Sequence, residues 1–189
     1  MACLDRGDLA GVGALMLSSA DKLARAGADF LICPDNTIHQ ALAHVLPQSP
    51  RPWLHIAEEV AAEAAARGYR RIGILGTRWL VDSGVYPDKL AAEGLDHVRP
   101  GQEDRDALAR IIMDELVYGV FKPESVARLQ AIIGNLRDAG CDAVVLGCTE
   151  LPLVLNDGNS ALPTLDSTRI LARAALTRAL QPPDARQPR

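Results

Sequence analysis

The hydrophobic positions of this chain follow two periods, one typical of helices and one typical of buried strands. Over residues 8–26, Leu9, Val12 and Met16 recur at helical spacing, which predicts an amphipathic helix. The predicted helices cover residues 8–26, 38–45, 55–67, 87–93, 103–118, 123–139 and 167–180, and the predicted strands cover residues 28–33, 70–75, 95–98, 142–147 and 162–165. Strands that alternate with helices in this way predict an α/β fold, with a parallel sheet covered on both faces.

One segment of the chain occurs twice. Residues 27–37 (GADFLICPDNT) align without a gap with residues 140–150 (GCDAVVLGCTE), and each copy has a Gly, an Asp, an apolar run and a polar cluster. The alignment places Asp35 opposite Cys148. Open α/β sheets bind ligands outside the carboxyl ends of their strands. Two such strand ends therefore predict two half-sites that face each other across a crevice, one on each side of a small substrate.

Composition excludes several classes of partner. Of 189 residues, 48% are hydrophobic and 4% are aromatic, so a core would be built from Ala, Leu, Val and Ile. The net charge is −4 and no basic cluster occurs, which argues against nucleic acid as a partner. No apolar stretch approaches the roughly 20 residues of a membrane span. The first residues do not resemble a signal peptide, so we expect a cytoplasmic protein.

The four cysteines do not predict a metal site or a disulfide. None forms a CxxC pair and no His lies at metal-ligand spacing, so we expect no bound metal and reduced thiols. Cys3 and Cys141 fit small buried hydrophobic positions. Cys148 lies between Gly147 and a predicted helix start, where a thiolate is favoured and acts as base or nucleophile. The alternative for Cys148 is an inert buried thiol.

Three loops join predicted strands to predicted helices, at residues 33–39, 76–78 and 147–150. Backbone N–H groups at such positions, helped by Thr and Asn side chains, form a carboxylate site. Ordinary N-capping by Asn, Asp and Thr is the alternative for any single loop. Three similar loops at one sheet edge favour a binding site.

Four motifs in these loops are similar to those of the aspartate/glutamate racemase superfamily, which also contains hydantoin racemases, maleate isomerases and arylmalonate decarboxylases. They are Asn36-Thr37-Ile38-His39, Gly76-Thr77, Gly147-Cys148-Thr149-Glu150-Leu151-Pro152-Leu153 and Leu165-Asp166-Ser167-Thr168. The resemblance spans residues 8 to about 180 and implies two similar Rossmann-like lobes with parallel sheets and an active site in the crevice between them. Residues 1–75 and 167–180 would form the first lobe, residues 76–166 the second, and residues 181–189 a disordered tail.

The resemblance also implies a reaction and its residues. Racemases of this superfamily use neither pyridoxal phosphate nor metal, and two acid/base groups flank the substrate α-carbon, so no cofactor is expected. Cys148 would be one of these groups. The residues implied to bind the carboxylate of a small amino acid or dicarboxylate are Asn36, Thr37, Gly76, Thr77 and Thr149. A homodimer is also implied.

The chain departs from the superfamily pattern in two places. The opening strand and its Gly-rich loop are absent, so we expect the first lobe to be incomplete at its N-terminus. Asp35 stands where a Cys usually precedes the Asn-Thr pair. We therefore expect Asp35 to be the second acid/base, with Cys33 as the alternative because side chains two apart on a strand share a face. His39 and Glu150 are further possible site residues.

Other residues are weaker candidates for the crevice: His55, Arg78, Tyr86 and Arg169. The predicted function is a cofactor-independent racemase or epimerase of an amino acid. The alternatives are a cis–trans isomerase or decarboxylase of a small dicarboxylic acid that uses Cys148, or an inactive remnant that binds a small acid.

Overall fold

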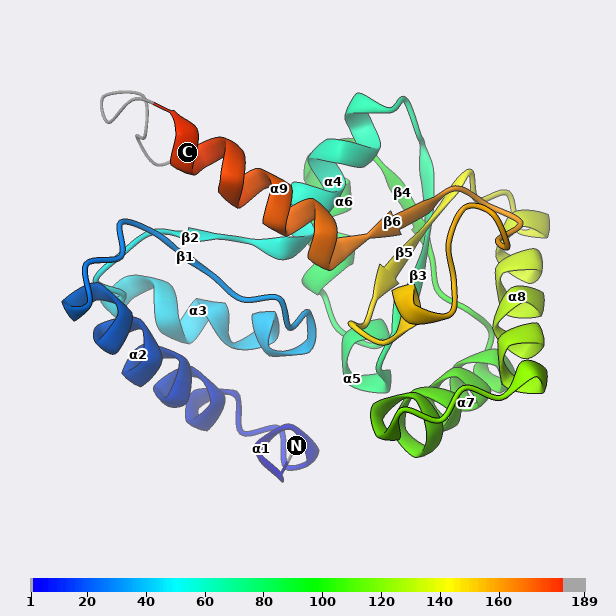
Figure 1. Ribbon diagram of the computed structural model, residues 1–189, viewed down its shortest axis with the longest axis horizontal. Helices are drawn as coiled ribbons and strands as arrows, with labels where there is room; N and C mark the ends of the chain where they lie inside the picture. Colours follow the sequence, from blue (N-terminus) through cyan, green and yellow to red (C-terminus); the bar gives the residue numbers. More distant parts are fainter. Residues whose placement is uncertain (1, 182–189) are drawn as a thin grey trace.

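The computed structural model describes residues 2–181 and shows an α/β fold with two parallel sheets (Figure 1). One sheet has four strands in the order β4-β3-β5-β6, and the other pairs β1 with β2. The strands are β1 (Leu31–Ile32), β2 (Trp53–Leu54), β3 (Arg71–Gly76), β4 (Asp96–Val98), β5 (Ala143–Gly147) and β6 (Thr164–Asp166). The α/β prediction is confirmed. The predicted tail, apart from Gln181, lies outside the described residues.

Most predicted helices are present within one to three residues of their expected ends. The α-helices are α1 (Ala2–Asp5), α2 (Leu9–Arg25), α3 (Leu42–Val45), α4 (Ile56–Ala66), α5 (Arg78–Val81), α6 (Val85–Ala92), α7 (Gln102–Arg110), α8 (Pro123–Asp138) and α9 (Ser167–Leu180). The other helical turns are η1 (Thr37–Ala41), η2 (Leu46–Gln48), η3 (Ile111–Glu115), η4 (Leu116–Tyr118) and η5 (Leu151–Leu153). The predicted helix 103–118 is thus three segments, with a π-helical turn at η3.

Several short elements were not predicted, among them α1, α5 and β2, which have two to four residues each. Periodicity over so few positions carries no signal. One predicted strand is shorter than expected. The predicted strand 28–33 forms ladder bonds only over Leu31–Ile32, because its partner β2 is itself two residues long.

The sheet that contains β3 was not expected. The lobe boundary predicted after residue 75 would place β3 in the first lobe, together with β1. Instead β3 lies at the centre of the four-stranded sheet, in register with β5 from the Ile72–Ala143 pair to the Gly76–Gly147 pair. Both strands are buried on both faces, so each is the natural neighbour of the other. Their carboxyl ends therefore lie side by side.

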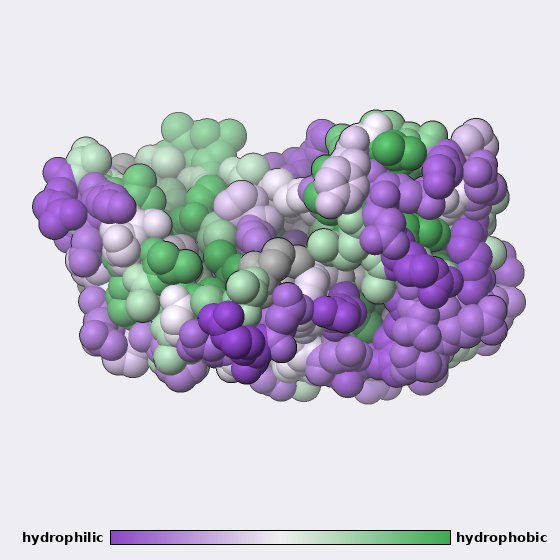
Figure 2. Space-filling model, turned by 90° about the horizontal axis from the view of Figure 1, so that it is seen from below, coloured by the Kyte–Doolittle hydropathy of each residue, from purple (hydrophilic) through white to green (hydrophobic). Residues whose placement is uncertain are grey.

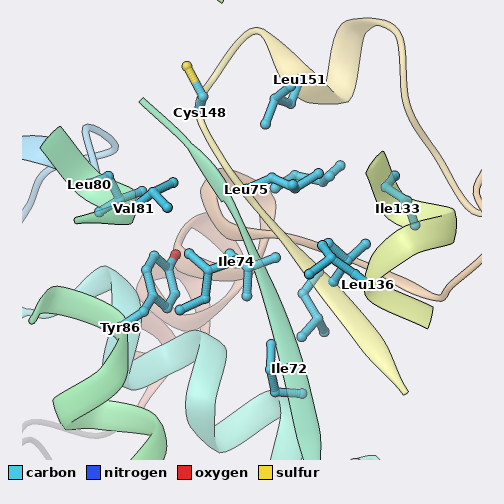
Figure 3. Packing of buried hydrophobic residues seen from close by; sticks show 14 of the residues in the cluster. Ile72, Ile74, Leu75, Leu80, Val81, Tyr86, Ile133, Leu136, Cys148 and Leu151 are labelled. Atoms are coloured by element: carbon cyan, nitrogen blue, oxygen red, sulfur yellow. The ribbon is translucent and has the colours of Figure 1, made fainter. Parts of the chain in front are cut away.

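The main hydrophobic core surrounds the four-stranded sheet. Ile72, Ile74 and Leu75 of β3 pack with Ile133 and Leu136 of α8 and with other buried side chains (Figure 3). The two-stranded sheet has its own cover, with α2 and α3 on one face and α9 on the other (Figure 1). Both sheets are thus enclosed by helices, as expected for parallel strands.

The surface differs between the two parts of the molecule. In Figure 2, hydrophobic residues gather on the half that holds α1 and α2, while hydrophilic residues dominate the half that holds α7 and α8. Within residues 2–181, no helix has the length and apolar character needed to cross a membrane. Cytoplasmic residence stays a prediction.

Candidate active site

Cys148 lies directly after β5, at the carboxyl end of the four-stranded sheet. Its side chain is 9% exposed, and the sulfur points away from the hydrophobic core (Figure 3). The thiol donates a hydrogen bond to Glu150 Oε2 at 2.9 Å, and Thr149 Oγ1 donates to the same oxygen at 2.9 Å. Cys148 and Glu150 therefore form an acid–acceptor pair at the strand end.

The protonation state of this pair differs from the expectation. Burial, the hydrogen bond to Glu150 and the nearby negative charges raise the pKa of Cys148 from its usual 9.0 to about 12. Partial burial opposes ionisation of Glu150, but the bonds from Cys148 and Thr149 outweigh it and lower the pKa of Glu150. The prediction of a favoured thiolate is wrong here, because the thiol is buried and the Glu150 carboxylate lies beside the sulfur.

Asp35 lies on the loop that follows β1, at the carboxyl end of the two-stranded sheet. The side chain is exposed, and its Oδ1 accepts hydrogen bonds from the backbone N–H groups of Thr37 at 2.8 Å and Ile38 at 3.4 Å. These bonds hold the carboxylate at the start of η1. The Asp35 charge also contributes to the raised pKa of Cys148, so the two side chains are within electrostatic reach of each other.

Cys33 is half-buried near Asp35, and its thiol lies 4.0 Å from the Asp35 carbonyl oxygen. Burial is the main reason that its pKa is raised. Cys33 is therefore a protonated thiol close to the same loop. Which of Asp35 and Cys33 is the second acid/base stays a prediction.

Asn36 is buried with its side-chain amide bonded on both ends. Its Nδ2 donates to Ser167 Oγ at 3.0 Å, and its Oδ1 accepts from the Tyr86 hydroxyl at 2.6 Å. Ser167 in turn donates to the carbonyl oxygen of Leu146 on β5 at 2.9 Å. The amide that was expected to bind substrate thus bonds to protein groups. No pattern in the sequence connects Asn36 with Tyr86 or Ser167.

Thr37 and Thr77 join the two strand ends directly. Their hydroxyl oxygens lie 2.8 Å apart, although 40 residues separate them in the chain. Thr77 also accepts a hydrogen bond from the Leu80 N–H, which caps α5. Thr77 is therefore a helix cap, as one alternative expected, and it also contacts the opposite loop. Its role in binding a substrate carboxylate stays a prediction.

Gly76 and Gly147 lie opposite each other at the ends of β3 and β5. A Cβ atom on Gly147 would lie 2.6 Å from both the Leu75 carbonyl oxygen and Leu80 Cδ2. On Gly76 it would lie 2.6 Å from the same Leu80 atom. Close packing against backbone therefore requires glycine at position 147, whereas at Gly76 the close contact is with the movable end of the Leu80 side chain. A substrate-binding role for Gly76 stays a prediction.

His39 holds the Asp35 loop against the start of α4. Its Nε2 accepts the Ile56 N–H at 3.3 Å, so the ring proton sits on Nδ1, which donates to the Asp35 carbonyl at 2.7 Å. Burial lowers the pKa of His39 and keeps the ring neutral. The ring of His55 lies 4.7 Å away, and burial is the main cause that lowers its pKa to about 3. Both rings are structural in this arrangement.

A cavity of about 470 Å³ runs beside the edge strand β6, and one of about 270 Å³ lies beside α5. Arg67, Arg169 and Arg173 line the larger one. Neither lining includes Cys148 or Asp35. Within residues 2–181, no group of three His, Cys, Asp or Glu side chains is placed to hold a metal ion.

Comparison with known proteins agrees with this geometry. The family model for Asp/Glu/Hydantoin racemase matches residues 3–175. A solved Yersinia pestis structure, assigned as an Asp/Glu racemase, superposes with a TM-score of 0.88 at 32% identity, over 95% of this chain and 79% of its own. An aspartate racemase homologue from Pyrococcus horikoshii has a TM-score of 0.79 at 31% identity, over 89% and 74%.

Curated relatives point to the same class of enzyme. The broad-specificity amino-acid racemase RacX of Bacillus subtilis is 25% identical, over 86% of this chain and 70% of its own length. Glutamate racemase of Pseudomonas aeruginosa is 31% identical over 71% of this chain, and the match spans only half of that enzyme. These relatives are amino-acid racemases, a class of isomerases. The chain belongs to the Asp/Glu/Hydantoin racemase family.

Proposed function

We propose that this protein is a cofactor-independent amino-acid racemase or epimerase that works with two acid/base groups, Cys148 and Asp35. One observation carries the proposal. A protonated thiol and a carboxylate follow strands of two different sheets, and the charge on Asp35 acts on Cys148. A reaction that inverts an α-carbon needs one proton acceptor and one proton donor on opposite faces of the substrate.

The protonation states suggest the order of events in one direction. The Asp35 carboxylate removes the α-proton from one face, and the Cys148 thiol delivers its proton to the other face. The new thiolate then recovers a proton from solvent, and Asp35 releases one. The charge that develops on the substrate carboxylate needs hydrogen-bond donors. The hydroxyls of Thr37, Thr77 and Thr149, which lie beside the acid/base pair, are the groups we assign to this role.

The pair is chemically asymmetric, which has a kinetic consequence. Two enantiomers have equal free energies in solution, so kcat/KM must be the same in both directions. The direction that uses the Cys148 thiol as donor starts from the resting protonation state. The reverse direction needs a Cys148 thiolate, which the raised pKa makes rare. We therefore expect kcat and KM to differ between enantiomers by the same factor.

A second candidate is decarboxylation of a small dicarboxylic acid. The raised pKa of Cys148 favours it, because a single thiol that stays protonated can deliver one proton after loss of carbon dioxide. Cis–trans isomerisation with Cys148 as nucleophile is less favoured, since it needs the thiolate. The family resemblance supports two further parts of the proposal, a homodimer and cytoplasmic residence, and light scattering of the purified protein tests the first.

The test is α-proton exchange by NMR, with L- and D-amino acids incubated with the protein in D2O. Wild type should replace the α-proton of its substrate and produce the enantiomer. Cys148→Ser should stop formation of the enantiomer. Cys141→Ser, which removes a buried thiol two residues before β5, should not. Enantiomer formed at the wild-type rate by Cys148→Ser would refute the assignment.

Two more variants test whether Asp35 or Cys33 is the second acid/base group. Asp35→Asn should abolish enantiomer formation if Asp35 is the base, whereas Cys33→Ser should leave it intact. The reverse pattern would assign the role to Cys33. If a folded wild type exchanges no amino acid, carbon dioxide release from a panel of malonates tests the second candidate. Thermal-shift titration with the same acids tests the inactive remnant.

A further inference from the structure

A row of buried polar groups crosses the molecule between the two strand ends. It runs from the Tyr86 hydroxyl on α6 through the Asn36 amide to Ser167 Oγ at the start of α9, and ends at the Leu146 carbonyl on β5. The bonds are 2.6, 3.0 and 2.9 Å long. The three side chains are at most 2% exposed. Hydrogen bonds thus link four parts of the fold that are distant in sequence: α6, the loop of Asp35, the start of α9 and β5.

Two members of this row, Asn36 in its middle and Leu146 at its end, lie close in sequence to the proposed acid/base groups. Asn36 directly follows Asp35, and Leu146 precedes Cys148 by two residues. The orientation of each bond is defined by chemistry. Burial raises the pKa of Tyr86, so its hydroxyl stays a donor, and the Leu146 carbonyl can only accept. Ser167 therefore accepts from Asn36 and donates to β5.

We propose that Tyr86 is a positioning residue, which through Asn36 and Ser167 holds the Asp35 loop at a fixed place relative to the strand that carries Cys148. Its catalytic consequence rests on the proposed function. Without the Tyr86 hydroxyl, Asn36 Oδ1 loses the hydrogen bond that it accepts in the interior. Buried polar groups that lose a partner are unfavourable, so the loop shifts toward arrangements in which water reaches Asn36.

The role of Asn36 follows from the same contacts. Its amide is expected to bind the substrate carboxylate by resemblance, but here it accepts from Tyr86 and donates to Ser167. In this protein Asn36 acts through the backbone of its own loop. The Thr37–Thr77 bond is a separate connection, between the Asp35 loop and the end of β3, and it does not involve Tyr86.

The first experiment needs no activity. Hydrogen exchange measured by mass spectrometry on Tyr86→Phe should show roughly tenfold faster exchange in residues 33–41, and unchanged exchange in α8. Ser167→Ala should loosen the same segment. Tyr118→Phe is the matched control, since it removes the same hydroxyl from a side chain that is 75% exposed. Unchanged exchange of residues 33–41 in both variants would overturn the proposal.

The second experiment measures turnover where wild type is active. Tyr86→Phe should lower kcat about 10- to 100-fold with little change in KM, because small misplacements of reacting groups are costly. Val60→Ala removes buried core volume of α4 and none of the hydrogen bonds of the row, and should lose thermal stability without this loss of kcat. An equal kcat loss in Val60→Ala, or a raised KM with unchanged kcat in Tyr86→Phe, would contradict a positioning role.

A double variant tests whether the row acts as a unit. Tyr86 and Ser167 bond to opposite ends of the Asn36 amide, so the combined effect of Tyr86→Phe and Ser167→Ala on kcat should be close to the larger single effect. Fully additive losses would mean that the two residues act separately. If wild type shows no α-proton exchange, the proposed function fails, and hydrogen exchange still decides whether Tyr86 holds the loop.

Discussion

The protonation state of Cys148 offers the most direct test of the proposed chemistry. Its pKa of about 12, against a usual 9.0, corresponds to about 4 kcal/mol favouring the thiol over the thiolate. At pH 8 an ordinary thiol is about 10% ionised, and one with this pKa about 0.01%. Alkylation, which requires the thiolate, should therefore be about 1,000-fold slower at Cys148 than at a thiol with the usual pKa.

Glu150→Gln is the perturbation that isolates one cause of this state. Gln keeps the size of the side chain and removes the negative charge 2.9 Å from the sulfur. We expect the thiolate to become easier to form and alkylation of Cys148 to accelerate about 10- to 100-fold. Glu124→Gln makes the same change at an exposed position on α8 and should have no effect.

The assay is a time course of iodoacetamide labelling with peptide mass spectrometry, which follows each cysteine separately. In wild type the Cys148 rate should rise tenfold per pH unit with no plateau up to pH 10, and Cys3, which is only half-buried, should react faster. A plateau below pH 9 would show a stabilised thiolate and refute the reasoning from burial and charge. A Glu150→Gln rate equal to that of wild type would remove Glu150 from the explanation.

Other consequences concern stability, measured by urea denaturation. Gly147→Ala should cost about 2–3 kcal/mol because its Cβ meets backbone at 2.6 Å, whereas Gly134→Ala, on α8 with open space around it, should stabilise by about 0.5–1 kcal/mol. Thr37→Val should cost about 1 kcal/mol through the lost bond between the strand ends, while Thr168→Val should be neutral or stabilising, since no partner for its buried hydroxyl is found among the described residues. The folded-state pKa of His55 is about 3 against a usual 6.5, so the folded protein favours the neutral ring. The stability that neutral His55 contributes is complete above pH 6.5 and is lost as the pH falls toward 3, by up to about 1.4 kcal/mol per pH unit. His55→Asn keeps a capping side chain at the start of α4 and should reduce this pH dependence; an unchanged slope would contradict the assignment.

Local patterns in the sequence were sufficient for the fold class and for the positions of the reactive strand ends. Periodicity reports which face of a segment is buried, so long elements such as α2, α8 and β5 were predicted closely. The internal repeat placed Asp35 and Cys148 at equivalent strand ends. The structure has these ends in two different sheets, and the two half-sites stay a prediction.

Tertiary structure decided the chemistry of those strand ends. Asn36 and Ser167 are 131 positions apart, and no local pattern encodes their bond. The Cys148 thiol is protonated because of burial and of the side chains that surround it, which a motif does not specify. The membership of β3 in the four-stranded sheet followed from its pairing with β5. Residue periodicity determines which side chains are buried, but only the packing of distant segments determines what each buried or reactive group meets.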